Sequence, residues 1–138
     1  MRRSTCRTAG LAAAAALALS LATDGPAAAA DDWGTLDRIG HSRLQACKVP
    51  VDGEAWRIRL RVRTTDQGGA KGSLRVHRGY EPTDRRWRSG HVPADSTSEV
   101  GSVRVPRGTH RWLFSTSVET SGGGSSSFGF SAVDVNRC

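Results

Sequence analysis

Apolar and charged side chains alternate without interruption over residues 56–63. The apolar positions are Trp56, Ile58, Leu60 and Val62, and the charged positions are Arg57, Arg59, Arg61 and Arg63. Because successive side chains of a β-strand point to opposite faces, this pattern predicts a strand with one buried face and one cationic face. We place the strand at residues 55–64 and expect its apolar face at the centre of the core, against Trp112, Phe114 and Phe130.

The same period of two predicts further short strands before and after this stretch. They cover residues 44–51, 73–78, 85–92, 99–105, 110–119 and 128–135. Turn-forming pairs such as Asp52-Gly53 and Arg107-Gly108 separate them. In the last strand the apolar phase slips by one residue between Ala132 and Val133, which predicts a bulge or bend there. Residues 31–43 have no clear period, and we expect them to be a lead-in segment that is only partly ordered.

Many short strands, regularly spaced turn signals and the lack of a convincing helical pattern predict an all-β fold. We expect a small antiparallel β-sandwich of six to eight strands over residues 44–138, in preference to a small barrel. One plausible hairpin pairs residues 55–64 with residues 73–78 and sets Arg61 opposite Arg75. In that arrangement Arg75 and His77 join the face formed by the four arginines.

Residues 1–30 have the layout of a secretory signal peptide. Arginines precede an apolar run at residues 11–22, which is too short to span a bilayer, and an A-x-A motif ends at Ala30. We expect Sec-type export, cleavage near Ala30 and a secreted product with no membrane attachment. Loss of this segment removes three positive charges and one negative charge, which lowers the formal net charge from +7 to +5.

Two cysteines, Cys47 and Cys138, follow the signal segment. An even number of cysteines in an exported chain predicts a disulfide bond. Closing a loop of about ninety residues contributes roughly 4–5 kcal/mol in the chain-entropy estimate. The signal segment, the composition and the terminal cysteine resemble small secreted single-disulfide proteins of high-GC Gram-positive bacteria. This resemblance implies location and size, and the chain carries no motif of a named family.

The residues that usually carry catalysis or bind metals show no diagnostic spacing. The histidines form no H-x-x-x-H or H-E-x-x-H pattern, and the chain has no G-x-S-x-G. We therefore expect no metal site, no cofactor and no catalytic residue. A small extracellular hydrolase stays open as an alternative, because carboxylates such as Glu54 and Glu119 could converge in space.

The basic residues are the main indication of a binding function in this sequence, and they fall into two groups. The candidates for anion binding are Arg57, Arg59, Arg61, Arg63, Arg75 and His77. A second group mixes arginines with aromatic residues, which suits stacking on rings and binding of phosphate, sulfate or carboxylate. Its members are Arg78, Tyr80, Arg85, Arg86, Trp87 and Arg88.

Three interpretations of these basic residues remain open. They are a solvated outer face in an arginine-rich sequence, a binding module for an anionic extracellular polymer, or a surface of an inhibitor or toxin-like protein that binds a secreted partner. The polymer would be a cell-wall polysaccharide or a phosphate polymer. We expect no specific recognition of nucleic acid, because the sequence offers no element that reads bases. The distinguishing question is whether acidic neighbours already neutralise the arginines.

Overall fold

The computed structural model describes residues 31–108 and 111–138. The predicted signal peptide, residues 1–30, lies outside the described residues. Within the described ranges the chain forms nine strands: β1 Gly34–Ile39, β2 Ser42–Val51, β3 Ala55–Thr64, β4 Ala70–Arg78, β5 Glu81–Val92, β6 Ser96–Thr97, β7 Gly101–Pro106, β8 Trp112–Thr120 and β9 Gly123–Ser131. No helix among these residues is long and apolar enough to cross a membrane.

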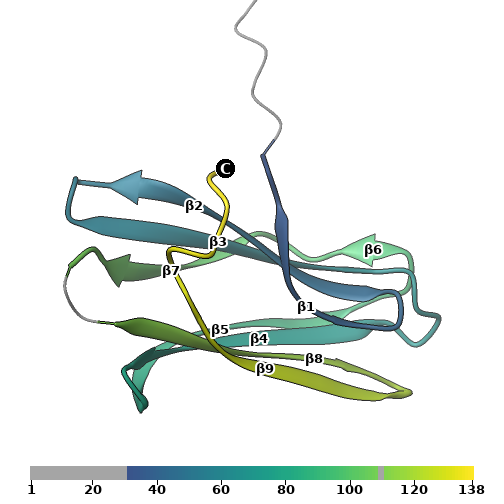
Figure 1. Cartoon of the computed structure of the whole chain (residues 1–138). Coiled ribbons are helices and arrows are strands. Elements are labelled where there is room, and N and C mark those ends of the chain that lie inside the picture. Colours follow the sequence, from purple (N-terminus) through teal and green to yellow (C-terminus); the bar gives the residue numbers. More distant parts are fainter. Residues whose placement is uncertain (1–30, 109–110) are drawn as a thin grey trace, which may run out of the picture.

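The strands form two antiparallel sheets that lie face to face (Figure 1), which confirms the predicted all-β sandwich. The first sheet has the order β1-β2-β3, and both β6 and β7 pair with the remaining edge of β3. The second sheet has the order β5-β4-β8-β9. Between β6 and β7, Ser98 continues the ladder: its N–H donates to the carbonyl of Val62 at 2.8 Å, and its Oγ accepts from the N–H of Val62 at 2.9 Å.

The predicted hairpin between residues 55–64 and 73–78 is wrong, because β3 and β4 belong to different sheets. Arg75 and His77 therefore do not share a face with the arginines of β3. A hairpin would set the apolar sides of both strands next to each other on one face of a single sheet. In the observed fold the chain passes from the first sheet to the second between β3 and β4. The apolar sides of the two strands therefore face each other across the core. Alternation along the sequence is the same in both arrangements, so it could not distinguish them.

The core lies between the two sheets and has the predicted side chains at its centre. Ile58, Leu60 and Val62 are fully buried, and they belong to one cluster with Leu74, Val76 and Phe114 of the second sheet. Trp56, Trp112 and Phe130 are only partly buried and pack against this cluster. At Gly72 the sheets approach so closely that a methyl group would overlap the Cγ2 of Val62, which explains a glycine inside a strand.

The segment predicted as a lead-in contains an edge strand. β1 pairs with β2, and the register shifts between Thr35 and Asp37. Asp37 is 5% exposed, and its carboxylate accepts hydrogen bonds from the hydroxyls of Thr116 at 3.1 Å and Ser125 at 2.8 Å. The strand therefore joins the first sheet through its backbone and the second sheet through the carboxylate of Asp37, and Leu36 and Ile39 pack against the core. The shift interrupts the period of two, which is why the pattern hid this strand.

The last strand begins and ends earlier than predicted, at Gly123–Ser131, and the chain turns at residues 132–135, where the sequence predicted a bulge or bend. A separate bulge lies within the strand, at Gly129. In β8 and β9, Phe114 pairs with Phe130 and Ser115 pairs with Phe128, so Gly129 is the extra residue. Its φ of 104° lies in a region that favours glycine. The bulge turns Phe130 toward the core and leaves Phe128 on the outer face, where it is 49% exposed.

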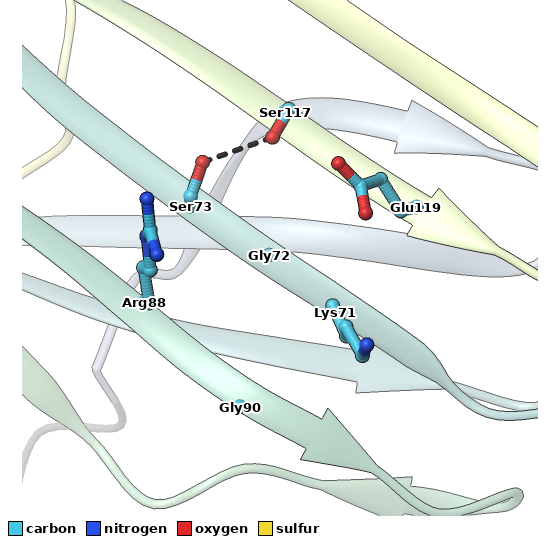
Figure 2. Close-up of a pocket in the computed structure, with 7 residues that line it drawn as sticks. All are labelled: Lys71, Gly72, Ser73, Arg88, Gly90, Ser117 and Glu119. Carbon is cyan, nitrogen blue, oxygen red and sulfur yellow. Dashed lines mark hydrogen bonds between the residues drawn. The ribbon is translucent and has the colours of Figure 1, made fainter.

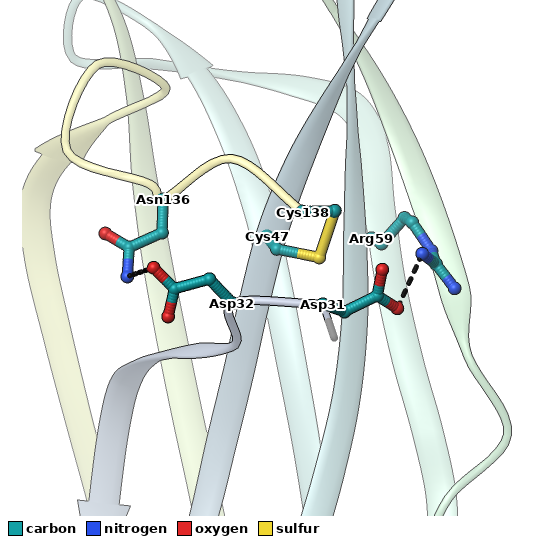
Figure 3. The surroundings of a disulfide bond; sticks show 6 residues. All are labelled: Asp31, Asp32, Cys47, Arg59, Asn136 and Cys138. Carbon is teal, nitrogen blue, oxygen red and sulfur yellow. Dashed lines mark hydrogen bonds and ion pairs between the residues drawn. A yellow bond between two sulfur atoms is a disulfide. The ribbon is translucent and has the colours of Figure 1, made fainter. Parts of the chain in front are cut away.

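The disulfide bond between Cys47 and Cys138 is present, as predicted (Figure 3). It joins β2 to the last residue of the chain, over a sequence separation of 91. The backbone reinforces the connection: the N–H of Lys48 donates to the carbonyl of Asn136 at 2.8 Å, and the N–H of Cys138 donates to the carbonyl of Lys48 at 3.1 Å. The C-terminal residues therefore lie along β2.

Replacing both cysteines by serine, Cys47→Ser with Cys138→Ser, should lower the free energy of unfolding by about 3–5 kcal/mol. The reason is that the unfolded chain regains the freedom that the closed loop denies it. Urea unfolding followed by tryptophan fluorescence measures the change. As a control, a reducing agent should destabilise the wild type by the same amount and leave the double variant unaffected. An unchanged urea midpoint would contradict this prediction.

Candidate anion-binding site

The four arginines of β3 lie on the outer face of the first sheet, as predicted. The register sets two of them directly opposite further arginines: Arg63 faces Arg43 on β2, and Arg57 faces Arg104 on β7. Like charges in directly opposed positions destabilise a sheet by roughly 0.2–1 kcal/mol per pair. This face therefore needs negative charge from the chain or from a ligand.

Part of that negative charge comes from the chain itself. Asp31 Oδ2 lies 2.8 Å from Arg59 Nη1 (Figure 3), and the ring centroid of Trp33 lies 4.1 Å from Arg61 Cζ and 5.5 Å from Arg59 Cζ. Arg61 Nε also donates to Gln45 Oε1 at 3.0 Å. The two middle arginines are thus engaged by residues that precede β1 and by β2, which leaves Arg57 and Arg63 exposed.

The direction of the pKa shift of Arg61 reflects its burial and its neighbours in the middle of this face. Burial and then the positive charge of Arg63 lower the pKa of Arg61, while Asp31 acts in the opposite direction. Arg104 also has an acidic neighbour, Asp52, at 3.7 Å, although both side chains are well exposed. An exposed pair of this kind contributes about 0–1 kcal/mol. The first face is therefore partly neutralised from within.

The outer face of the second sheet holds a further set of cations. Arg75 of β4 lies directly opposite Arg86 of β5, and Ser73 lies opposite Arg88. On the other side of β4, Ser73 Oγ and Ser117 Oγ are 2.9 Å apart (Figure 2). No ion pair within 4.0 Å involves these arginines among the residues that the structure describes. On the first face Arg59 and Arg104 each have an acidic partner, although the opposed Arg43 and Arg63 have none in the described ranges. On the second face none of Arg75, Arg86 and Arg88 has one among these residues.

Two adjoining shallow depressions, each of about 320 Å³, cover this face, and both are lined by Ser73, Arg88 and Ser117. We call them together the serine–arginine groove. Its residues are Lys71, Ser73, Arg75, His77, Arg86, Arg88, Ser115, Ser117, Glu119 and Ser126. Figure 2 shows how β4, β5 and β8 present part of this set on one surface. Glu119, the single carboxylate of the set, lies opposite Lys71 in the register.

Aromatic rings border the groove at His77. The rings of His77 and Phe128 meet edge to face at 5.1 Å, and Tyr80 stacks on Phe128 at 6.1 Å. Tyr80 is 81% exposed, in the turn between β4 and β5. His77 Nε2 lies 2.9 Å from Ser115 Oγ. Its Nδ1 is buried and has no hydrogen-bond partner within the described part of the chain.

The structure regroups the residues predicted from the sequence. Arg75 and His77, from the first predicted group, lie with Arg86 and Arg88 from the second group and are bordered by Tyr80. The remaining members of the second group point elsewhere. Trp87 packs against the core, Arg85 lies over Trp112 at 5.1 Å, and Arg78 pairs with Trp112 and Glu81 in the β-ladder.

Sequence reasoning missed the serines and Phe128 as parts of this surface. The alternating Ser115, Ser117 and Glu119 of β8 were a visible signal of a polar outer face. Phe128 could not be found in this way, because the bulge at Gly129 decides which side of β9 it occupies.

One group of potential metal ligands occurs in the described ranges: Asp31, Cys47 and Cys138, whose ligand atoms lie within 4.8 Å of one another. Both sulfur atoms are joined in the disulfide, and only a thiolate is a good metal ligand. We therefore attribute the closeness of these atoms to the disulfide bond and to the ion pair between Asp31 and Arg59.

Comparison with protein-family models, curated proteins and solved structures gives no significant match. The function is therefore inferred from the chemistry of the two outer faces.

Proposed function

We propose that this protein is a secreted, non-catalytic binding module whose serine–arginine groove holds an anionic extracellular polymer. The polymer would be a cell-wall polysaccharide or a phosphate polymer. The observation that carries this proposal is the opposition of Arg75 and Arg86 without an acidic partner. A phosphate, sulfate or carboxylate between the two guanidinium groups would remove their repulsion and form charge-assisted hydrogen bonds.

The length and composition of the groove support a polymer. Cations lie at intervals along it, from Lys71 through Arg88 to Arg75 and Arg86, so that repeating anionic groups could bind together. The serine hydroxyls between them can donate to and accept from sugar hydroxyls or phosphate oxygens. At the end near His77, the exposed rings of Tyr80 and Phe128 offer faces for a sugar ring.

Reversing the two opposed charges, Arg75→Glu with Arg86→Glu, should weaken binding to heparin and to purified teichoic acid by at least about tenfold, because anion-binding donors become repulsive. Binding of the wild type should fall steeply with added salt. Calorimetric titration and elution from heparin resin measure both effects.

The matched control is Arg57→Glu with Arg104→Glu, which reverses an opposed pair on the first sheet and changes the net charge equally. This control should retain most of the affinity. Equal losses in the two variants would mean that binding follows net charge alone, and an unaffected groove variant would remove the groove from the proposal.

Tyr80→Ala should separate the two classes of polymer. If a sugar ring stacks on this side chain, the affinity for an anionic polysaccharide should fall by roughly 1–1.5 kcal/mol, while the affinity for linear polyphosphate stays unchanged. Tyr80 is well exposed, so its removal should leave the melting temperature unaltered. Equal affinities of wild type and variant for both polymers would exclude the aromatic end of the groove from binding.

A second candidate function rests on the 2.9 Å contact between His77 Nε2 and Ser115 Oγ, which is the geometry of a nucleophile and its base. This contact favours a small hydrolase. The support is weaker than for binding, because His77 Nδ1 has no hydrogen-bond partner among the described residues to orient the ring or stabilise its charged form.

We expect wild type and Ser115→Ala to hydrolyse p-nitrophenyl acetate at the same background rate. Spectrophotometric detection of p-nitrophenolate measures this rate. The hydrolase candidate would gain support from turnover by the wild type that both Ser115→Ala and His77→Gln abolish.

A further inference from the structure

A second concentration of positive charge lies around Trp56, at one end of the sandwich. Arg107 Cζ lies 3.8 Å from the centroid of the indole, Lys48 Nζ lies 5.1 Å from it, and Arg137 Cζ lies 5.7 Å from it. These cations come from β2, from the residue after β7 and from the C-terminal segment. The fold therefore brings together charges that are far apart in the sequence.

The cluster carries repulsion that no acidic side chain relieves by direct contact. None of the three cations forms an ion pair within 4.0 Å over the described residues. Lys48 is only 8% exposed, and its ammonium group donates to the carbonyls of Ala132 at 2.6 Å and Val133 at 3.1 Å. Burial and then Arg137 lower the pKa of Lys48, while Asp134 acts in the opposite direction.

An open, shallow cavity of about 290 Å³ lies beside this cluster. Trp56 and Trp112 line it together with Arg107 and Arg111, and Ala132 and Val133 add apolar surface. Val133 is 85% exposed, so its side chain is accessible to a ligand at this cavity. None of the residues that line this cavity lines the serine–arginine groove.

The chemistry of the lining defines the ligand. The guanidinium group of Arg107 lies over the indole of Trp56, and its Nη1 donates to the carbonyl of Gly53 at 3.3 Å. These contacts hold the group in place, and its other N–H groups can donate to an anion. Arg111 adds a second positive charge on the same cavity. The cavity is about ten times the volume of one water molecule and lies near the lower limit of small-molecule sites, so it has room for a ring beside an anionic group.

We propose that this cavity binds a small anion attached to a ring, such as a phosphate or carboxylate on an aromatic or sugar ring. The anionic group would lie against Arg107 and Arg111, and the ring would lie against Trp112 and Val133. The proposal is independent of the polymer-binding function, because the two surfaces share no lining residue. It assigns to the protein a second ligand, of a different size.

The test is titration of the ¹⁵N-labelled, disulfide-intact protein with phenyl phosphate, followed by NMR of the indole N–H groups. The chain has four tryptophans, and single Trp→Phe variants assign their signals. We expect saturable shifts for Trp56 and Trp112 and none for Trp33, which lies by the arginines of β3. Absence of saturable shifts at Trp56 and Trp112 would overturn the proposal.

Arg107→Gln with Arg111→Gln should weaken binding of phenyl phosphate by at least about tenfold, since both charge-assisted contacts are lost. Both side chains are exposed, so the variant should fold normally. Arg43→Gln with Arg63→Gln, an opposed pair on the first sheet that lines neither this cavity nor the groove, should bind phenyl phosphate as the wild type does. Undiminished binding by the Arg107 and Arg111 variant would overturn the site, and equally tight binding of inorganic phosphate would overturn the requirement for a ring.

Discussion

Burial of two alternating strands against each other organises this molecule. The apolar sides of β3 and β4 exclude water by packing against each other from different sheets, with Gly72 allowing Val62 to approach. The same step sends the polar sides of both strands to opposite surfaces of the sandwich. The two cationic faces are thus a direct consequence of how the core closes (Figure 1).

This arrangement places arginines directly opposite one another on both outer faces, where they repel. The two faces differ in how far acidic residues offset this repulsion. On the first face Asp31 pairs with Arg59 (Figure 3). The ring of Trp33 lies by Arg61. On the second face Arg75 opposes Arg86 with hydroxyl groups but no acid beside it. This asymmetry separates a surface that acidic residues of the chain partly neutralise from one whose opposed arginines have no acidic partner among the described residues. Composition alone could not tell the two apart.

The two ends of the described chain also influence which arginines have neighbours of opposite charge. The C-terminal segment lies along β2 through the disulfide, and Asp32 accepts a hydrogen bond from Asn136 at 3.2 Å. This arrangement places Asp31 over the first face and brings Arg137 to Trp56. The disulfide therefore does more than close a loop, because it helps to decide which arginines are covered and which lie beside a cavity.

The sequence by itself determined the alternation, the all-β class, the buried side of β3 and the cysteine pair, because each depends on a local period or on residue type. Only the tertiary structure decided that Arg75 faces Arg86 rather than Arg61, because pairing depends on which sheet a strand enters. It likewise decided the strand at β1, the side that Phe128 occupies and the cations around Trp56. Bulges and contacts between distant segments produce these features, and neither leaves a repeating signal in the chain.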